Sequence, residues 1–218
     1  MKSKMYEFQK KIKTSSKTNF FLLLAFFFIA ACSCGCTKDA DKGDPIFALP
    51  PETQVGANTF GVTINGKVYV PRDPTGTNYG GVTTKGMFLT GLYISGYNYT
   101  EVVVQDGASS VAFNLIIHLE NLNMAKDYVL KQSNFQDQVD SISENHIFFK
   151  IWDSNISNYA YYGSIENQGV VKVSKLSGGI FAGVFSGKFV RSDNPNDFIQ
   201  ITDGRFDIGP GLYSKIFP

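Results

Sequence analysis

Residues 170–206 read VVKVSKLSGGIFAGVFSGKFVRSDNPNDFIQITDGRF, and this stretch decides the fold class. Apolar and polar residues alternate over 170–176, 180–190 and 198–206, which is typical of strands that bury one face. The connections between these runs contain Gly, Ser, Asp, Asn and Pro, the residues that turns favour. We therefore expect a three-stranded antiparallel meander whose second turn spans residues 193–197.

The middle run of this meander has an unusual composition. It places three phenylalanines, Phe181, Phe185 and Phe189, on one face, with Gly183 and Gly187 between them. Glycine inside a strand marks a strong bend or a place where another backbone approaches closely. We expect one of these two features in the middle of the meander.

The same alternation recurs through the preceding sequence. Asn65-Gly66 separates two alternating runs, and such a loop is the strongest short-range signal for a β-hairpin because both residues need positive φ. Residues 126–130 fit a short strand or a turn, and residues 131–140 fit one helical turn. Further strands are expected at 59–64, 67–70, 87–95, 97–105, 110–119, 146–152 and 159–164.

These runs amount to about nine to eleven strands, and no helical period follows residue 31. The predicted fold class is all-β: an antiparallel β-sandwich or a partly closed β-barrel. Residues 53–218 are expected to form it as a single antiparallel β domain. A lipoprotein signal peptide and a flexible tether are expected to precede it.

Residues 1–31 have the organisation of a secretory signal peptide. Six lysines and one acid lie here, and an unbroken apolar run, FFLLLAFFFIAA, occupies residues 20–31. A helix of 12 residues rises about 18 Å, well short of the roughly 30 Å hydrocarbon core of a bilayer. The run is therefore expected to be a cleaved signal and not a membrane-spanning helix.

The apolar run ends in IAAC at residues 29–32, which resembles the bacterial lipobox: an aliphatic residue, two small residues and a cysteine. In such signals the cysteine is acylated and becomes the first residue of the mature protein. Two or three acyl chains make a stable membrane anchor. We predict acylation of Cys32. Cys36 is the alternative, because the TKD that follows it is a common start of Bacteroidota-type lipoproteins.

Residues 32–52 are expected to hold the acylated cysteine and a flexible linker, since charge, Gly and Pro disfavour packing. The acidic start of this linker resembles the signal that sends Bacteroidota-type lipoproteins to the cell surface. A metal or redox site is the rival interpretation of Cys32, Cys34 and Cys36. Zinc motifs add a second ligand pair far downstream, and the sequence has no further cysteine. We predict no metal site and no cofactor.

The charge distribution excludes one class of partner. Of 20 basic and 19 acidic residues, residues 1–31 hold six and one, which leaves 14 and 18 and a net charge of −4 for the rest. Nucleic-acid binding needs clustered positive charge, so we expect no nucleic-acid partner. The 14% of aromatic residues argues against a disordered chain.

Two stretches resemble an uncharacterised family of Bacteroidota-type secreted lipoproteins. The first comprises LPPETQ at 49–54, GANTFG at 56–61 and INGKVYVP at 64–71; the second comprises VKVSKL at 171–176, SGKF at 186–189 and ITDGRFD at 201–207. The resemblance implies an all-β lipoprotein of unknown function and brings no catalytic residues. Similar proteins often have a cysteine soon after the Phe-Gly pair, where this chain has Val62-Thr63.

The sequence offers little for catalysis. Its two histidines, His118 and His146, lie in expected strands, where we expect half-buried or surface positions, and no Gly-x-Ser-x-Gly elbow exists. A regular strand would place Asp203 and Asp207 about 13 Å apart, too far for a glycosidase pair. We expect a turn or bulge at Asp203-Gly204 and an acidic partner for Arg205. We predict no catalytic residues.

Two short polar segments resemble a calcium-binding loop and a glycosylation motif. Asp193 and Asp197, with two asparagines between them, could bind calcium through oxygen ligands, but a solvated turn fits them better. Residues 140–142, DSI, resemble the O-glycosylation acceptor of such bacteria. The first pattern lacks the spacing and the final Glu of an EF-hand, and the second is only three residues long, so neither is among our predicted sites.

The strongest binding signal is aromatic. Trp152, Tyr159, Tyr161 and Tyr162 bracket the polar loop 153–158 and are our ligand-binding candidates. Aromatic rings beside Asn and Asp side chains suit a glycan, through ring stacking and hydrogen bonds to hydroxyls. The alternative is that these rings fill the core or stiffen cross-strand pairs. A second aromatic group consists of Tyr93, Tyr97 and Tyr99.

Together these features predict a non-enzymatic lipoprotein of the cell envelope. A lipid would anchor it in the outer membrane, facing either the periplasm or the cell surface. Its β domain would bind a glycan, a peptide or a partner protein. Two alternatives stay open: an envelope hydrolase that acts on carbohydrate, and a structural accessory subunit of a surface complex.

Overall fold

The computed structural model describes residues 48–71, 78–79, 82–83, 86–94, 97–106, 113–135 and 144–210. All of them belong to one compact unit, Ile46–Pro218. They form twelve strands and no helix. The strands are β1 Thr59–Ile64, β2 Lys67–Tyr69, β3 Asn78–Tyr79, β4 Val82–Thr83, β5 Met87–Ile94, β6 Tyr97–Asp106, β7 Phe113–Glu120, β8 Asp127–Val129, β9 His146–Asp153, β10 Asn158–Ser177, β11 Ile180–Arg191 and β12 Asn194–Ile208.

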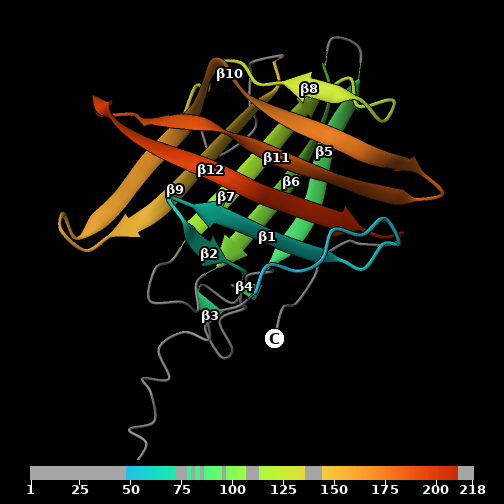
Figure 1. The fold of residues 1–218 in the computed structure, drawn as a ribbon, viewed down its shortest axis with the longest axis horizontal. Coiled ribbons are helices and arrows are strands. Elements are labelled where there is room, and N and C mark those ends of the chain that lie inside the picture. Colours follow the sequence, from blue (N-terminus) through green and yellow to red (C-terminus); the bar gives the residue numbers. More distant parts are fainter. Residues whose placement is uncertain are drawn as a thin grey trace, which may run out of the picture. The chain divides into compact units, whose positions relative to one another are not determined.

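Ten strands form one antiparallel sheet in the order β2-β1-β12-β11-β10-β9-β7-β6-β5, with β8 paired to β10; β3 and β4 form a separate pair. The sheet folds over itself: in Figure 1, β8, β10, β11, β12 and β1 lie in front and β5, β6 and β7 cross behind them. In the described part of the chain the edge strands β2 and β5 do not pair with each other, so the sheet does not close into a barrel. The predicted all-β class is therefore confirmed, and the fold is sandwich-like.

The meander predicted from residues 170–206 is the front layer. Its strands are longer than expected, and β10 alone spans 20 residues. The first part of β10 pairs with β9 and its later part pairs with β8, so this one strand joins the two layers. We predicted two strands, 159–164 and 170–176. The structure replaces them with one strand whose register against β11 shifts between Ser164 and Gly169.

The core lies between the two layers, and the glycines of β11 make it possible. A Cβ on Gly187 would lie 2.8 Å from the Cα of Gly169, and one on Gly183 would lie 2.6 Å from the carbonyl oxygen of Lys172. The predicted close approach of another backbone is thus confirmed. The three phenylalanines that alternate with these glycines all enter the core. The core also contains residues of both layers, and together its members include Phe60, Phe181, Phe185, Phe189, Phe206, Val102, Leu115, Ile117, Ile147 and Phe149.

Three local predictions have clear outcomes. The Asn65-Gly66 hairpin is confirmed, with φ of 48° and 80° at its two residues. The turn expected at 193–197 is wrong: β12 begins at Asn194, which pairs with Arg191, so the connection is tight. Residues 131–135 are not helical but run along β10, and 136–140 lie outside the described residues.

The chain before β1 forms a strap over the outer surface of the front layer. We define it as residues 49–57, although residues up to 52 were expected in the linker. A Cβ on Gly61 of β1 would lie 2.6 Å from Pro50, and Arg205 Nη1 donates to the Pro50 carbonyl at 3.2 Å. Residues 49–52, which we expected in the linker, therefore pack against the β domain.

Candidate functional site

The β9–β10 hairpin brings three of the four predicted aromatic residues onto one face of the sheet. Trp152 pairs directly with Tyr159, and Tyr161 lies two residues further along β10. The alternate residues of β9, Ile147 and Phe149, enter the core, so Trp152 and its neighbours point outward. We call Trp152, Tyr159 and Tyr161 the aromatic face.

The rings of the aromatic face are accessible and held in place. Trp152 is 37% exposed and Tyr161 is 36% exposed. Trp152 meets Tyr159 edge to face, with 5.3 Å between ring centroids, and Lys150 Nζ lies 5.6 Å from the Tyr159 ring centroid. Tyr161 stacks at 6.0 Å on the buried ring of Phe148. Rings that are held by neighbouring side chains on the protein side and exposed on the solvent side suit stacking against a sugar ring.

Tyr162, the fourth predicted candidate, is not part of this face. Because side chains alternate along a strand, its ring enters the core, where it stacks on Phe149 at 5.4 Å and is 8% exposed. Its hydroxyl reaches the rim and donates to Asp197 at 3.3 Å. Burial and the Asp197 carboxylate raise the pKa of Tyr162, against the opposing effect of Arg191. The structure therefore separates Tyr162 from the other three candidates, and its ring is not open for stacking.

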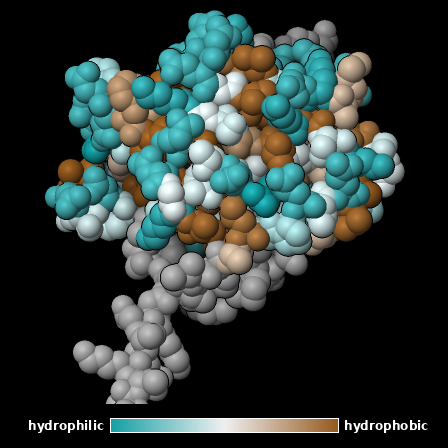
Figure 2. Space-filling model, viewed as in Figure 1, coloured by the Kyte–Doolittle hydropathy of each residue, from teal (hydrophilic) through white to brown (hydrophobic). Residues whose placement is uncertain are grey.

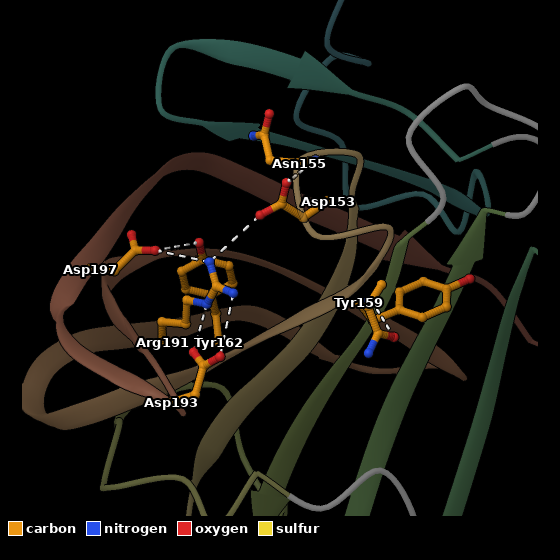
Figure 3. Close-up of polar contacts among 8 residues, drawn as sticks. Asp153, Asn155, Tyr159, Tyr162, Arg191, Asp193 and Asp197 are labelled. Atoms are coloured by element: carbon orange, nitrogen blue, oxygen red, sulfur yellow. Dashed lines mark hydrogen bonds and ion pairs between the residues drawn. The ribbon is translucent and has the colours of Figure 1, made fainter.

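Arg191 fastens the tips of two hairpins together behind the aromatic face. Figure 3 shows its guanidinium among three carboxylates, while the Tyr159 ring points away from them. The nitrogen–oxygen distances are 2.7 Å to Asp193, 3.4 Å to Asp197 and 3.6 Å to Asp153. Hydrogen bonding to Asp193 is the main cause of the raised pKa of Arg191. Asp193 and Asp197 thus share a cation from the protein itself, which removes the argument for calcium there.

The aromatic face continues onto β11 and β12, which sequence reasoning missed. Val190 pairs with both Gly163 and Phe198, and Phe198 is 40% exposed. Lys188 Nζ lies 3.8 Å from the Phe198 ring centroid. By strand geometry the Cα atoms of Tyr161 and Phe198 lie about 12 Å apart. The alternation in 180–190 and 198–206 shows which residues point outward, but only the register of the strands places them beside β10.

The two histidines lie in a buried row and not at the surface, so our expectation for them is wrong. His118 is 0% and His146 is 2% exposed, and their rings stack at 4.8 Å. The cause is a second apolar cluster, which lies on the outward side of β6, β7 and β9. Because the main core covers the other side, these strands are buried on both faces. The members of this second cluster are Val103, Ile116 and Phe148, with Phe88 and Phe135 packed against them.

Glu101 orients the His118 ring, since its carboxylate lies 3.0 Å from Nδ1. In the tautomer that donates Nδ1–H to Glu101, the buried Nε2 is an acceptor without a hydrogen-bond partner among the described residues. Among the described residues, no three His, Cys, Asp or Glu side chains lie close enough to hold a metal ion.

A concave region separate from the aromatic face lies between the strap and the front layer. It is a pocket of about 320 Å³ whose walls include Glu52, Lys172 and Arg205. Figure 2 shows this side of the molecule, with polar residues over most of it and hydrophobic patches between them. Both cations face acids at 3.9 Å, Lys172 facing Asp127 and Arg205 facing Glu52. The pocket therefore offers a ligand no excess charge and no exposed aromatic ring.

The strap is held by Asp207, whose role the sequence did not reveal. Its carboxylate accepts hydrogen bonds from the Thr53 hydroxyl at 2.6 Å and from three backbone N–H groups at 2.9 to 3.2 Å. Asp203 has φ of 52° at a register shift between β1 and β12. This confirms the expected bulge and the acidic partners of Arg205, which lies 3.9 Å from Asp203.

Other predicted features lie outside the described residues: the lipidation candidates Cys32 and Cys36, the 140–142 motif, and the side chains of Tyr93 and Tyr97. Tyr99, the remaining member of the second aromatic group, is buried and stacks on His118 at 4.7 Å. In the described part of the chain no helix is long and apolar enough to cross a membrane. No protein-family model, curated protein or solved structure matches the chain.

Proposed function

We propose that this protein is a lipid-anchored lipoprotein of the bacterial cell envelope whose β domain binds a glycan through the aromatic face. The observation that carries the binding proposal is the outward exposure of Trp152 and Tyr161, each above one third, in a hairpin whose tip is held through the Arg191–Asp153 ion pair. More than one third of the surface of each of these two residues stays in contact with water in the folded protein. Stacking against a sugar would bury it.

The residues around the rings support a polar ligand over an apolar one. The hairpin loop supplies Asn155 and Asn158, whose amides hydrogen-bond well to hydroxyl groups. Asn155 N–H donates to the Asp153 carboxylate at 2.9 Å, so the loop has a defined shape. Rings for stacking beside amides for hydroxyl recognition form a typical glycan-binding combination.

Retention on an array of immobilised neutral and anionic polysaccharides tests the binding proposal. We expect Trp152→Ala to weaken binding about tenfold or more, because stacking contributes roughly 1.5 kcal/mol. Met124→Ala is the matched control, since Met124 is also exposed, at 53%, but lies before β8. Failure to retain any glycan, or equal weakening by both variants, would contradict the proposal.

The anchor is tested separately by intact mass and membrane partitioning in a diderm bacterial host. We expect Cys32→Ala alone to leave an unprocessed precursor without acyl mass. Cys36→Ala is the matched control and should be processed like the unmodified protein. Processing without any gain of acyl mass would overturn the anchor, and the opposite pattern of the two variants would move the site to Cys36.

A further inference from the structure

We infer that the pocket between the strap and the front layer is a second binding site, which takes a short peptide of two or three residues with free amino and carboxyl ends. This inference is independent of the proposed glycan site, because the pocket and the aromatic face share no residue. The pocket measures about 320 Å³, which lies within the usual range for small-molecule sites. The basis of the inference is that one wall of the pocket carries a negative group and the opposite wall a positive one.

Strand pairing places the walls and the floor of this pocket. Lys172 of β10 pairs with Val184 of β11, and Val184 pairs with Arg205 of β12, so the three residues form a row across the front layer. All three point outward, because the residue that follows each of them along its strand enters the core. Two strand spacings put the Cα atoms of Lys172 and Arg205 about 10 Å apart. Val184 is the apolar floor between them, and the Glu52 carboxylate of the strap lies 3.9 Å from Arg205 Nη2.

The strap wall offers acceptors for an ammonium group. The Glu52 side chain is 63% exposed, and its contact with Arg205 is too long for a hydrogen bond, so no described residue hydrogen-bonds to this carboxylate. Beside it, the Thr53 hydroxyl donates to the Asp207 carboxylate at 2.6 Å, which leaves the hydroxyl oxygen as an acceptor. The amino end of a peptide, with its positive charge and N–H donors, fits this wall.

The β10 wall offers donors for a carboxylate. The Lys172 side chain is 58% exposed, and its ion-pair partner Asp127 lies 3.9 Å away and outside the pocket. A surface ion pair of this length contributes little and leaves the three N–H donors of the ammonium group open to a better-placed anion. Two residues further along, the Ser174 hydroxyl donates to the Ala182 carbonyl oxygen at 3.2 Å, so its oxygen can accept from a peptide N–H. The carboxyl end of a peptide fits this wall.

The distance between the walls and the balance of charge together select the ligand. An extended chain spans about 3.5 Å per residue, so a single amino acid is too short to reach both walls, whereas two or three residues suffice. A plain anion or cation would pair with one wall only. A second hollow of about 160 Å³ also borders Glu52, Lys172 and Val184, which leaves room for the side chains of the peptide.

The test uses the full-length protein purified from membranes in detergent, with Ala-Val and Ala-Ala-Val as probes, since apolar side chains suit the Val184 floor. In calorimetry we expect N-acetylation or C-terminal amidation of the tighter probe to weaken its binding about tenfold, and free alanine to bind more weakly still. Glu52→Gln should abolish the effect of N-acetylation and keep that of amidation, and Lys172→Met should do the reverse. This crossed pattern would assign one end of the peptide to each wall.

Glu166→Gln is the matched control and should bind like the unmodified protein, because Glu166 is also exposed, at 57%, and paired with a lysine, but lines neither hollow. Binding of neither probe would overturn the inference and leave the glycan proposal standing, since the polysaccharide array tests that proposal separately. Equal binding of free and blocked peptides, or of alanine and the peptides, would also overturn it. If Trp152→Ala weakened peptide binding as much as Glu52→Gln, the peptide would bind at the aromatic face and the assignment to the pocket would fail.

Discussion

The two ends of the front-layer strand β12 both use acidic side chains, but in opposite ways. Near its end a single buried carboxylate, that of Asp207, accepts four hydrogen bonds from the strap. Near its start, Asp193 and Asp197 surround Arg191 close to solvent, together with Asp153 from the neighbouring hairpin. The first arrangement closes a loop over the sheet. The second holds two hairpin tips while leaving their rings uncovered.

This difference separates stability from binding. A buried carboxylate whose acceptor positions are filled by backbone donors contributes to stability and has nothing left for a ligand. Ion pairs near the surface contribute little, but they fix the geometry of the chain segments that carry them. The strap end should therefore govern unfolding, and the hairpin end should govern recognition.

The largest effect should follow Asp207→Ala. It leaves the Thr53 hydroxyl and three backbone N–H groups without their acceptor, and we expect a loss of about 3 kcal/mol in the free energy of unfolding. Urea unfolding followed by circular dichroism measures this loss. Asp127→Ala is the control: its carboxylate is 61% exposed and should change stability by less than about 0.5 kcal/mol. Similar losses in the two variants would contradict the proposed contrast between buried and exposed acids.

We also expect the Asp207 carboxylate to make the free energy of unfolding depend on pH. Burial raises the pKa of Asp207, but the hydrogen bonds from Thr53, Ala57, Gly56 and Val55 outweigh burial, so its pKa lies below the ordinary 3.8. Its stabilising contribution is complete above pH 3.8 and is lost as the pH falls through its lowered folded-state pKa. The free energy of unfolding should decline with acidification in the unmodified protein and decline less steeply in Asp207→Ala. Parallel pH curves would argue against this assignment.

The sequence predicted the front layer well because its signals are local. Alternation in 170–206 identified the strands, and the glycines of β11 indicated close approach of a backbone, which Gly169 supplies. The same local reasoning divided β10 in two, since it had no means of knowing that Ser164 and Gly169 flank a register shift within one strand. It also placed the β11–β12 turn too late, because Asn and Pro near the start of β12 look like turn residues.

The candidate site was predicted only in part, because it depends on which strands are neighbours in the sheet and on which way each side chain faces. Local sequence grouped Tyr162 with Tyr161, yet neighbours on a strand face opposite ways. The strap contact of Asp207 joins residues more than 150 positions apart, and the neighbourhood of Lys188, Phe198 and Tyr161 depends on the order of three strands. Such contacts follow from sheet topology, which no single stretch of sequence specifies.

The next largest effect concerns the middle of the strands that connect the two ends. Gly187→Ala would place a Cβ 2.8 Å from the Gly169 Cα and 2.9 Å from the Gln168 carbonyl oxygen. Both contacts are with backbone atoms, which cannot move aside as a flexible side chain can. We therefore expect a loss of about 2 kcal/mol in the free energy of unfolding. Ser186→Ala, at the exposed neighbouring position, is the control and should be near neutral. An unchanged urea midpoint for Gly187→Ala would mean that the two strands are further apart than described.

The smallest stability effect, and the sharpest test of the comparison, is expected for Arg191→Met. The arginine side chain is 14% exposed, but its partner Asp193 is 67% exposed, so we expect a loss of only about 1 kcal/mol, smaller still at high salt. Glycan binding should nevertheless fall, because the hairpin tips lose their common partner. Arg191 lowers the pKa of Tyr162, so the variant should also raise the pKa of that phenol, measured by ultraviolet titration.

Asp207→Ala provides the reciprocal control for this variant. At a temperature where it stays folded, it should bind glycan like the unmodified protein, because the strap lies away from the aromatic face. A large stability loss in Arg191→Met with unchanged binding by the folded fraction would reverse the roles of the two ends. Strong binding loss in folded Asp207→Ala would show instead that the strap supports the binding surface. The two variants together therefore decide whether the ends of β12 act separately or as one unit.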